Sequence, residues 1–272
     1  MMLTDDHAVR SDPTTPFYRA VGDEREIFLA AAGRGLPVLL KGPTGCGKTR
    51  FVEAMAAAVG RDLITVAGHE DMTSADLVGR FLLKGGETVW VDGPLTRAVR
   101  EGAIFYLDEV VEARQDTTVV IHPLADHRRE LLVDRLGTTV PAAPGFQLVI
   151  SYNPGYQSVL KSLKESTRQR FVAIELRFPP PDIEIEVIAH ETGIDEHTAR
   201  LLVTLGDAVR GLDGISLREV PSTRMLILAG GLVAEGLSLR SAVRSAVVQV
   251  LSDDHDVIHA LGELVDAVLP RS

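Results

Sequence analysis

The segment from Gly42 to Thr49 reads GPTGCGKT and constrains the fold of this chain more than any other stretch. It matches the spacing G-x-x-x-x-G-K-[ST], in which the glycines let backbone N–H groups surround phosphate oxygens. The apolar run PVLLK precedes it and the helix-patterned run KTRFVEAMAAAVG follows it, so we expect a strand, a phosphate loop and a helix. The predicted phosphate-binding residues are Gly42, Pro43, Thr44, Gly45, Cys46, Gly47, Lys48, Thr49 and Arg50.

Four further apolar runs predict the rest of a sheet, namely DLITV, AIFYLD, FQLVIS and FVAIEL. Because helical patterns separate these strands, we expect an α/β fold with a five-stranded parallel sheet between two helical layers. From Pro179 onward the chain shows helix patterns and no convincing strand. We therefore expect a three-layer nucleotide-binding domain over residues 1–178 and a small, all-helical lid domain over residues 179–272.

Two insertions interrupt this alternation. The run RFLLKGGETVWVDG, at about residues 80–93, has two strand-like arms around a Gly-Gly pair, which predicts a β-hairpin. A weaker hairpin signal, ELLVDRLGTTV, lies at about residues 130–140, just before the fourth predicted strand.

The run AIFYLDEVVE places two consecutive carboxylates at the end of a predicted strand, where ligands bind in open parallel sheets. With Lys48 on the β- and γ-phosphates, Thr49 and Asp108 are the predicted ligands of Mg²⁺ for a bound ATP. Glu109 is suited to polarising the attacking water. The pair favours hydrolysis over phosphoryl transfer to an acceptor. A GTPase is disfavoured, because the sequence contains no N-K-x-D segment.

Polar residues near the later strands are candidates for γ-phosphate contacts. Asn153 follows the fourth predicted strand, and we expect its amide beside the second strand; the alternative is a simple Asn-Pro turn. Arg168 and Arg170 precede the fifth strand, and Arg224 lies in the first turn of a helix. Arginine binds phosphate oxygens in pairs, although most single arginines form surface ion pairs.

Charge and composition exclude several classes of protein. The formal net charge of −10 opposes non-specific attraction to nucleic acid. The single cysteine, Cys46, permits no internal disulfide. The first twenty residues lack the pattern of a signal peptide, and no apolar run reaches the ~18 residues that span a bilayer. We expect a cytoplasmic protein without a membrane span.

These motifs together resemble the CbbQ/NirQ/NorQ branch of the MoxR group of AAA+ ATPases. The resemblance covers Phe17 to about Ala229 and rests on the following stretches: KGPTGCGKTR, EDMTSADLVGR, WVDGPL, YLDEVVEARQDTTVVIHPLADHRR, FQLVISYNPGYQS and STRQRF. It implies a hexameric ring with ATP at the subunit interfaces.

The resemblance also implies roles for individual residues. Asn153 corresponds to the sensor-1 residue and Arg224 to the sensor-2 residue. Arg170 corresponds to the arginine finger that reaches the neighbouring subunit's nucleotide, with Arg168 as a rival. The first hairpin corresponds to a helix-2 insertion facing the pore or a partner. Its aromatic residues Phe81 and Trp90 are then either partner contacts or packing within the hairpin.

Members of this branch act with a partner that bears a von Willebrand factor A domain and remodel a metabolic enzyme. The resemblance implies either Rubisco activation or maturation of a nitric oxide or nitrite reductase, and the motifs are shared between these subgroups. The alternatives are a nucleotide-gated scaffold with slow hydrolysis and a generic MoxR-type chaperone.

Overall fold

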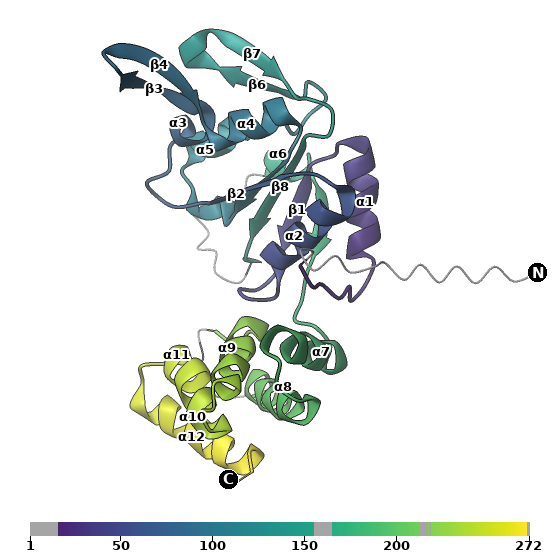
Figure 1. Ribbon diagram of the computed structural model, residues 1–272, viewed down its shortest axis with the longest axis vertical. Helices are drawn as coiled ribbons and strands as arrows, with labels where there is room; N and C mark the ends of the chain where they lie inside the picture. The colour runs from purple at the N-terminus through teal and green to yellow at the C-terminus, as the bar shows by residue number, and fades with distance from the viewer. Residues whose placement is uncertain (1–15, 155–164, 213–216, 218, 271–272) are drawn as a thin grey trace, which may run out of the picture.

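The computed structural model describes residues 16–154, 165–212, 217 and 219–270. The leader before residue 16 and residues 155–158 of the FQLVISYNPGYQS motif lie outside the described residues. The central sheet has five parallel strands in the order β2-β5-β8-β1-β9 (Figure 1), which confirms the predicted α/β fold. These strands are β1 (Val38–Lys41), β2 (Leu63–Ala67), β5 (Ile104–Asp108), β8 (Gln147–Tyr152) and β9 (Val172–Glu175).

Successive side chains of the strands pack on opposite faces of the sheet, as the two-residue repeat of a β-strand requires. Leu39 and Phe105 belong to one apolar cluster, whereas their neighbours Leu40 and Tyr106 belong to another. The helices α1 (Glu24–Arg34) and α2 (Lys48–Val59) contribute to the cluster of Leu40. The helices α3 (Ser74–Val78), α4 (Pro94–Glu101) and α5 (Gln115–Ile121) contribute to the cluster of Leu39. The result is three layers.

Two antiparallel hairpins extend from the layer of α3, α4 and α5 (Figure 1). The first pairs β3 (Gly79–Lys84) with β4 (Glu87–Asp92), and its turn residues Gly85 and Gly86 both have positive φ. The second pairs β6 (Glu130–Val133) with β7 (Thr138–Pro141).

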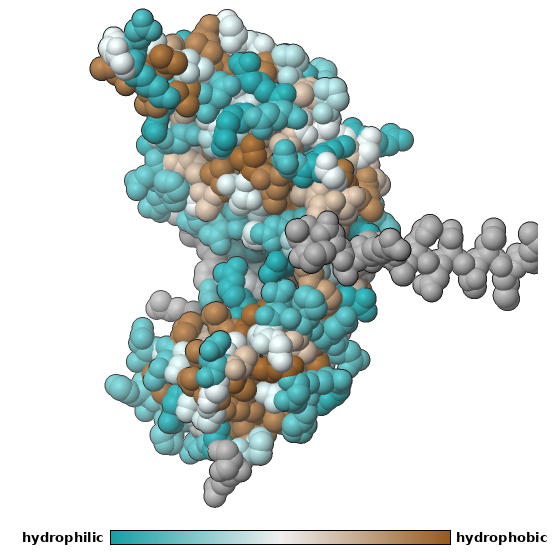
Figure 2. All heavy atoms as spheres, in the orientation of Figure 1, coloured by the Kyte–Doolittle hydropathy of each residue, from teal (hydrophilic) through white to brown (hydrophobic). Residues whose placement is uncertain are grey.

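The first hairpin exposes apolar side chains at its tip. Leu83 is 76% exposed, and brown atoms are visible at this tip in the upper left of Figure 2. Phe81 and Trp90 are paired across the strands. Their rings pack edge to face, with the ring centres 5.1 Å apart. The two aromatic residues therefore pack against each other, while Phe81 stays 44% exposed.

After β9 the described chain is helical and forms an apolar core of its own. The helices are α7 (Pro181–Thr192), α8 (Glu196–Arg210), α9 (Thr223–Ala234), α10 (Leu239–Val243), α11 (Gln249–Leu251) and α12 (His255–Val268), with a π-helical turn at Arg244–Val248. The short helix α6 (Glu165–Arg168) precedes β9. Within the described residues, no helix has both the length and the apolar character needed to cross a membrane.

Strand order determines which polar side chains meet. The carboxyl end of β8 lies between those of β5 and β1, because Leu107 pairs with Ile150 and Lys41 pairs with Tyr152. Asn153 therefore follows a strand next to the phosphate loop. Our expectation that it lies beside the second strand was wrong, because β5 separates β8 from β2.

Candidate active site

The loop from Gly42 to Gly47 connects the end of β1 to the first turn of α2. Two positions of the loop require glycine, because Gly45 has φ 72° and Gly47 has φ 99°, and other residues rarely adopt such positive φ angles. The first intrahelical hydrogen bond runs from the Phe51 N–H to the Gly47 carbonyl at 2.8 Å. The preceding N–H groups of this turn have no acceptor within the helix, and the helix dipole adds partial positive charge there. A helix N-terminus of this kind is suited to binding phosphate groups.

Lys48 is a buried cation held by the loop itself. Its side chain is 8% exposed, and its Nζ donates to the carbonyls of Gly42 at 2.9 Å and Pro43 at 3.0 Å. Among the residues that the structure describes, no carboxylate forms a salt bridge with it. A buried charge without a counter-ion is costly. The arrangement therefore favours an anion as the group that neutralises Lys48.

Asp108 is fixed at the carboxyl end of β5 by hydroxyl groups. Its Oδ1 accepts hydrogen bonds from the Tyr106 hydroxyl at 2.7 Å and from the Ser151 hydroxyl. Its Oδ2 lies 3.5 Å from Thr49 Oγ1, which is the outer limit of a hydrogen bond. Burial, together with the adjacent Asp108 carboxylate, raises the pKa of Tyr106, so this hydroxyl remains a donor at every physiological pH.

Glu109 has a left-handed backbone conformation, with φ 51° and ψ 48°, which is uncommon for a residue other than glycine. Its N–H donates to Asp108 Oδ1 and to Ser151 Oγ, both at 3.1 Å. On its other side, a Cβ on Gly68 would lie 2.5 Å from the Glu109 carbonyl oxygen. The surroundings thus hold the strained conformation, and strain of this kind is typical of functional positions.

Asn153 contacts the phosphate loop directly. Its Nδ2 donates to Thr44 Oγ1 at 3.0 Å, which joins the end of β8 to the loop after β1. The structure therefore places this predicted residue against the loop that holds Lys48.

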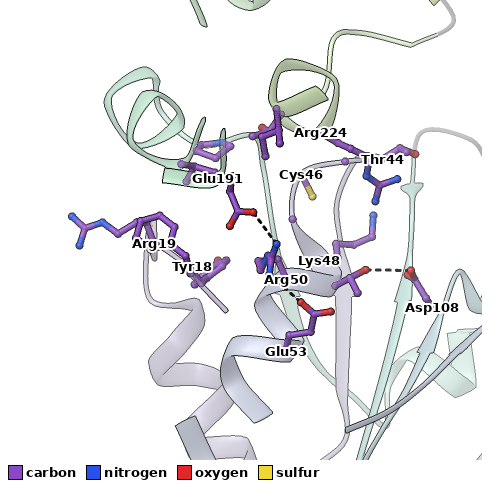
Figure 3. A pocket seen from close by; sticks show the side chains of 18 of the residues that line it. Tyr18, Arg19, Thr44, Cys46, Lys48, Arg50, Glu53, Asp108, Glu191 and Arg224 are labelled. Atoms are coloured by element: carbon purple, nitrogen blue, oxygen red, sulfur yellow. Dashed lines mark hydrogen bonds and ion pairs between the residues drawn. The ribbon is translucent and has the colours of Figure 1, made fainter. Parts of the chain in front are cut away.

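Lys48, Asp108 and Glu109 line a cavity of about 430 Å³, within the size range of pockets for small ligands, whereas Asn153 does not line it. The cavity is lined by the phosphate loop and the start of α2, by Asp108 and Glu109, by the segment of Phe17, Tyr18 and Arg19, and by residues of α7 and α9. Figure 3 shows Lys48 and Asp108 in the lower part of the view and Arg224 and Glu191 in the upper part. The cavity thus lies between the sheet and the helices that follow it.

Three arginines line the cavity, and two of them form ion pairs. Arg19 pairs with Glu186 at 3.0 Å, and Arg50 pairs with Glu191 at 3.0 Å and with Glu53 at 3.6 Å. Arg224 is exposed, and it forms no salt bridge to a described residue. Of the three, Arg224 is the one whose charge is available to a ligand.

Arg168 and Arg170 lie away from this cavity. They precede β9 at the amino-terminal edge of the sheet, where the Val172 N–H donates to the Pro37 carbonyl at 2.9 Å. The Arg170 guanidinium donates to the carbonyl of Ser166 in α6. The phosphate loop is at the opposite edge of the sheet, so neither arginine belongs to this chain's own cavity in this conformation.

The residues present fit a nucleotide with Mg²⁺. The phosphate loop and Lys48 supply N–H and ammonium donors, and the Thr49 hydroxyl and the Asp108 carboxylate are hard oxygen ligands of the kind that Mg²⁺ prefers. Cys46 is 8% exposed, and burial raises its pKa, so the thiol is neutral at physiological pH. Its position indicates packing in the loop rather than reactivity.

Several residues at the site were not singled out by sequence motifs. Ser151 is a polar residue that follows the apolar run LVI of its strand, which was a usable signal. The cavity residues Phe17, Tyr18 and Arg19 follow a polar leader and carry no motif. The pairing of Arg50 with Glu191 joins positions far apart in the sequence, and only the fold reveals it.

Comparison with known families gives two matches that together cover most of the chain. Residues 37–171 match the AAA domain (dynein-related subfamily), and residues 184–268 match the CbbQ/NirQ/NorQ C-terminal domain.

Three curated relatives align over nearly the whole chain. Protein NorQ of Paracoccus denitrificans is 59% identical over 93% of this chain and 94% of its own length. Protein CbbQ of Hydrogenophilus thermoluteolus is 56% identical over 96% and 97%. The denitrification regulatory protein NirQ of Pseudomonas aeruginosa is 56% identical over 93% and 97%.

Solved structures resemble the fold at low sequence identity. A mutant of RuvB from Thermotoga maritima aligns with a TM-score of 0.55 and 16% identity, over 91% of this chain and 71% of that one. A putative ATPase from Cytophaga hutchinsonii aligns with a TM-score of 0.53 and 17% identity, over 92% and 91%. At these identities the likeness concerns the fold alone.

Proposed function

The chain belongs to the CbbQ/NirQ/NorQ family of AAA+ ATPases, and we propose on this premise that it acts as a ring that remodels a client metabolic enzyme. It is an ATP hydrolase. The proposed ring carries ATP at its subunit interfaces and works with a partner that bears a von Willebrand factor A domain. Hydrolysis then supplies the energy to distort the client.

The observation that carries the hydrolytic part of this proposal is the pair of adjacent carboxylates held beside the phosphate loop. Asp108 presents Oδ2 towards Thr49, while Ser151 and Asp108 hold the backbone of Glu109 at the cavity wall. A bound Mg²⁺ would neutralise charge that develops on the phosphate oxygens. Thr49 and Asp108 are the proposed residues that hold it.

Each remaining residue has a proposed task in the same step. Lys48 and the loop N–H groups bind the β- and γ-phosphates. Glu109 orients the attacking water and accepts a proton from this water. Asn153 lies at the end of β8, where its amide donates to Thr44, and its proposed role is to hydrogen-bond the γ-phosphate or the attacking water. Arg224 contacts the same phosphate from α9.

Two substitutions test this mechanism. We expect Lys48→Ala to abolish nucleotide binding, because the buried ammonium is lost. Glu109→Gln should leave ATP binding within about twofold of the original and reduce turnover by about 10²-fold or more, the scale of general-base catalysis. Binding is measured by calorimetry and turnover by phosphate release. Glu101→Gln, which changes an exposed acid at the end of α4, is the matched control. Normal turnover in Glu109→Gln would show that the mechanism is wrong.

The client is proposed from the family to which the chain belongs. Similar identities to NorQ, CbbQ and NirQ leave two client classes, Rubisco and a nitrogen-oxide reductase. We expect the protein and its partner to reactivate one of these enzymes in an ATP-dependent assay and not the other. A nucleotide-gated scaffold is the competing function. It would give assembly with ATP and the same client effect in Glu109→Gln, although this variant hydrolyses ATP about 10²-fold more slowly.

A further inference from the structure

A fully buried carboxylate, Glu184, lies in the first turn of α7 near the nucleotide cavity. Arg210 at the end of α8 binds both of its oxygens, with Nη1 to Oε2 at 2.7 Å and Nη2 to Oε1 at 2.8 Å. Thr223 adds a third hydrogen bond from its hydroxyl to Oε1 at 2.6 Å. Buried charges are tolerated when they are paired and hydrogen-bonded in this way. The three residues come from α7, α8 and α9.

This network fixes the start of α9 from two sides. Arg210 Nε donates to the carbonyl of Pro221 at 2.8 Å, and Glu184 accepts from Thr223. Ser222 lies between Pro221 and Thr223 and is the N-cap of α9. Its side chain accepts a hydrogen bond from the Met225 N–H. The next residue after Thr223 is Arg224. The network therefore restrains the backbone immediately before the arginine that points into the cavity (Figure 3).

The same turn of α9 lies against the phosphate loop. A Cβ on Gly45 would lie 2.5 Å from both Cβ and Oγ of Ser222 and 3.3 Å from Cβ of Arg224. Glycine at this loop position thus permits the close approach of α9. On the other side, the Arg210 guanidinium lies 4.5 Å from the ring centre of Phe178, which connects the network to the segment after β9.

We infer that Glu184, Arg210 and Thr223 are positioning residues that hold Arg224 on the γ-phosphate of ATP. This inference rests on the proposed role of Arg224. A side chain that must meet one phosphate group loses much of its effect when it is displaced by an ångström. Glu184 and Arg210 do not line the cavity, whereas Thr223 lines it next to Arg224, so the network acts through the first turn of α9.

Thr223→Val is the variant that tests this inference most cleanly. It removes one hydroxyl and keeps the volume and the ion pair, whereas Glu184→Gln removes the buried carboxylate partner of Arg210, leaves Arg210 only the exposed Asp207, and endangers the fold of the helical region. We expect the ratio of ATP to ADP affinity to fall about tenfold, the scale of one hydrogen bond to a charged group. ADP affinity should stay unchanged, because ADP lacks the γ-phosphate. Binding is measured in the Glu109→Gln background, which prevents turnover.

Two further variants separate positioning from general loss of structure. Thr223→Ser retains the hydroxyl and should restore the original ratio. Thr204→Val removes an exposed threonine hydroxyl of α8 that donates to the Arg200 carbonyl and takes no part in the network, so it should leave the ratio unchanged. If Thr223→Val lowers ATP and ADP affinity equally, the role of the network is structural and the inference is wrong.

Combining the changes distinguishes this inference from the proposed function on which it rests. In Arg224→Ala the ratio should fall at least as far as in Thr223→Val, and adding Thr223→Val should then have no further effect, since residues that act through one another are not additive. An unchanged ratio in Arg224→Ala would reject the role of Arg224 itself. A lowered ratio in Arg224→Ala with an unchanged ratio in Thr223→Val would reject only the positioning network.

Discussion

At the scale of single residues, the two oxygens of Asp108 have different surroundings. Oδ1 accepts from the Tyr106 hydroxyl, the Ser151 hydroxyl and the Glu109 N–H, so it is saturated. Among the described residues, Oδ2 has only the long contact to Thr49. The carboxylate is therefore oriented by one oxygen and offers the other to the proposed metal. Outer residues that orient a ligand in this way are part of a metal site.

Ser151→Ala should weaken Mg²⁺ binding, because it removes a hydroxyl that orients Asp108. Ser151 is fully buried, and it holds both Asp108 and the backbone of Glu109. We expect ATPase activity at saturating ATP to fall about tenfold, and more Mg²⁺ to be needed for half-maximal rate, as is typical when an outer residue is lost. The measurement is phosphate release as Mg²⁺ is varied.

Ser241→Ala, at an exposed position in α10, is the matched control for this change. Nucleotide affinity without Mg²⁺ should be the same in both variants, because the phosphate loop is untouched. An unchanged Mg²⁺ requirement in Ser151→Ala would contradict the role given to Asp108.

At the scale of elements, the segment before α1 is tied to the cavity by one carboxylate. Glu24 accepts from the Tyr18 hydroxyl at 2.9 Å and from the N–H groups of Val21 at 2.7 Å and Gly22 at 2.8 Å. Burial alone raises the pKa of Glu24, but the hydrogen bonds from Val21, Tyr18 and Gly22 lower it on balance. The segment carries the aromatic wall of the cavity, so its order matters for nucleotide binding.

The lowered pKa gives a pH dependence of definite sign. A carboxylate with a lowered pKa in the folded state adds stability above its unfolded pKa of about 4.3, and this stability is lost as the pH falls through the folded value. We expect the amides of Val21 and Gly22 to lose protection from hydrogen exchange in that acid range. Glu24→Gln should show reduced protection already at pH 7 and no further acid step. An acid step of equal size in Glu24→Gln would assign it to other carboxylates.

The hairpin of β3 and β4 is the element that we expect to face the pore or a partner. None of its residues lines the cavity, and Leu83 at its tip is 76% exposed. Leu83→Ser should change the free energy of unfolding by no more than about 0.5 kcal/mol, as is usual for a surface position, and should leave basal ATPase activity unchanged. We expect it to reduce reactivation of the client. Leu237→Ser, exposed in the helical region, is the control. Full client reactivation by Leu83→Ser would exclude this tip as the contact.

Local patterns predicted the elements well and the long-range contacts poorly. The phosphate loop, the strand before Asp108 and the Gly85-Gly86 turn each carry short-range signals in glycine spacing and apolar runs. The order of the strands was partly missed, because nothing local places β5 between β2 and β8. The hydrogen bond between Glu184 and Thr223 joins two helices, and the spacing of apolar residues along the sequence does not predict such a contact.

At the scale of the whole molecule, the cavity is shared between the sheet and the helices that follow it (Figure 1). The ion pair of Arg50 in α2 with Glu191 in α7 spans the two parts at 3.0 Å. Both Arg168 and Arg170, however, lie at the opposite edge of the sheet from the phosphate loop. Neither arginine therefore lines the cavity of its own chain, and we propose that Arg170 of a neighbouring copy reaches this cavity instead.

Mixing two inactive variants tests this division between copies. Arg170→Ala should bind ATP normally and hydrolyse it about 10³-fold more slowly, the scale of an arginine finger supplied in trans. Lys48→Ala cannot bind ATP but still carries Arg170. In an equal mixture, about a quarter of the interfaces of a cyclic assembly join an intact phosphate loop to an intact Arg170, so ATPase activity should return in part.

The control for this mixture is Arg177→Ala, which removes an exposed arginine that pairs with Glu175 and should retain full activity alone. Because the rescue needs an interface, it should disappear on dilution below the concentration at which the ring dissociates. Mixing that gives no activity would point to Arg168 or another residue as the finger, and the same experiment with Arg168→Ala would then decide between the two arginines. Activity of Arg170→Ala by itself at the original rate would contradict the trans site at this position directly.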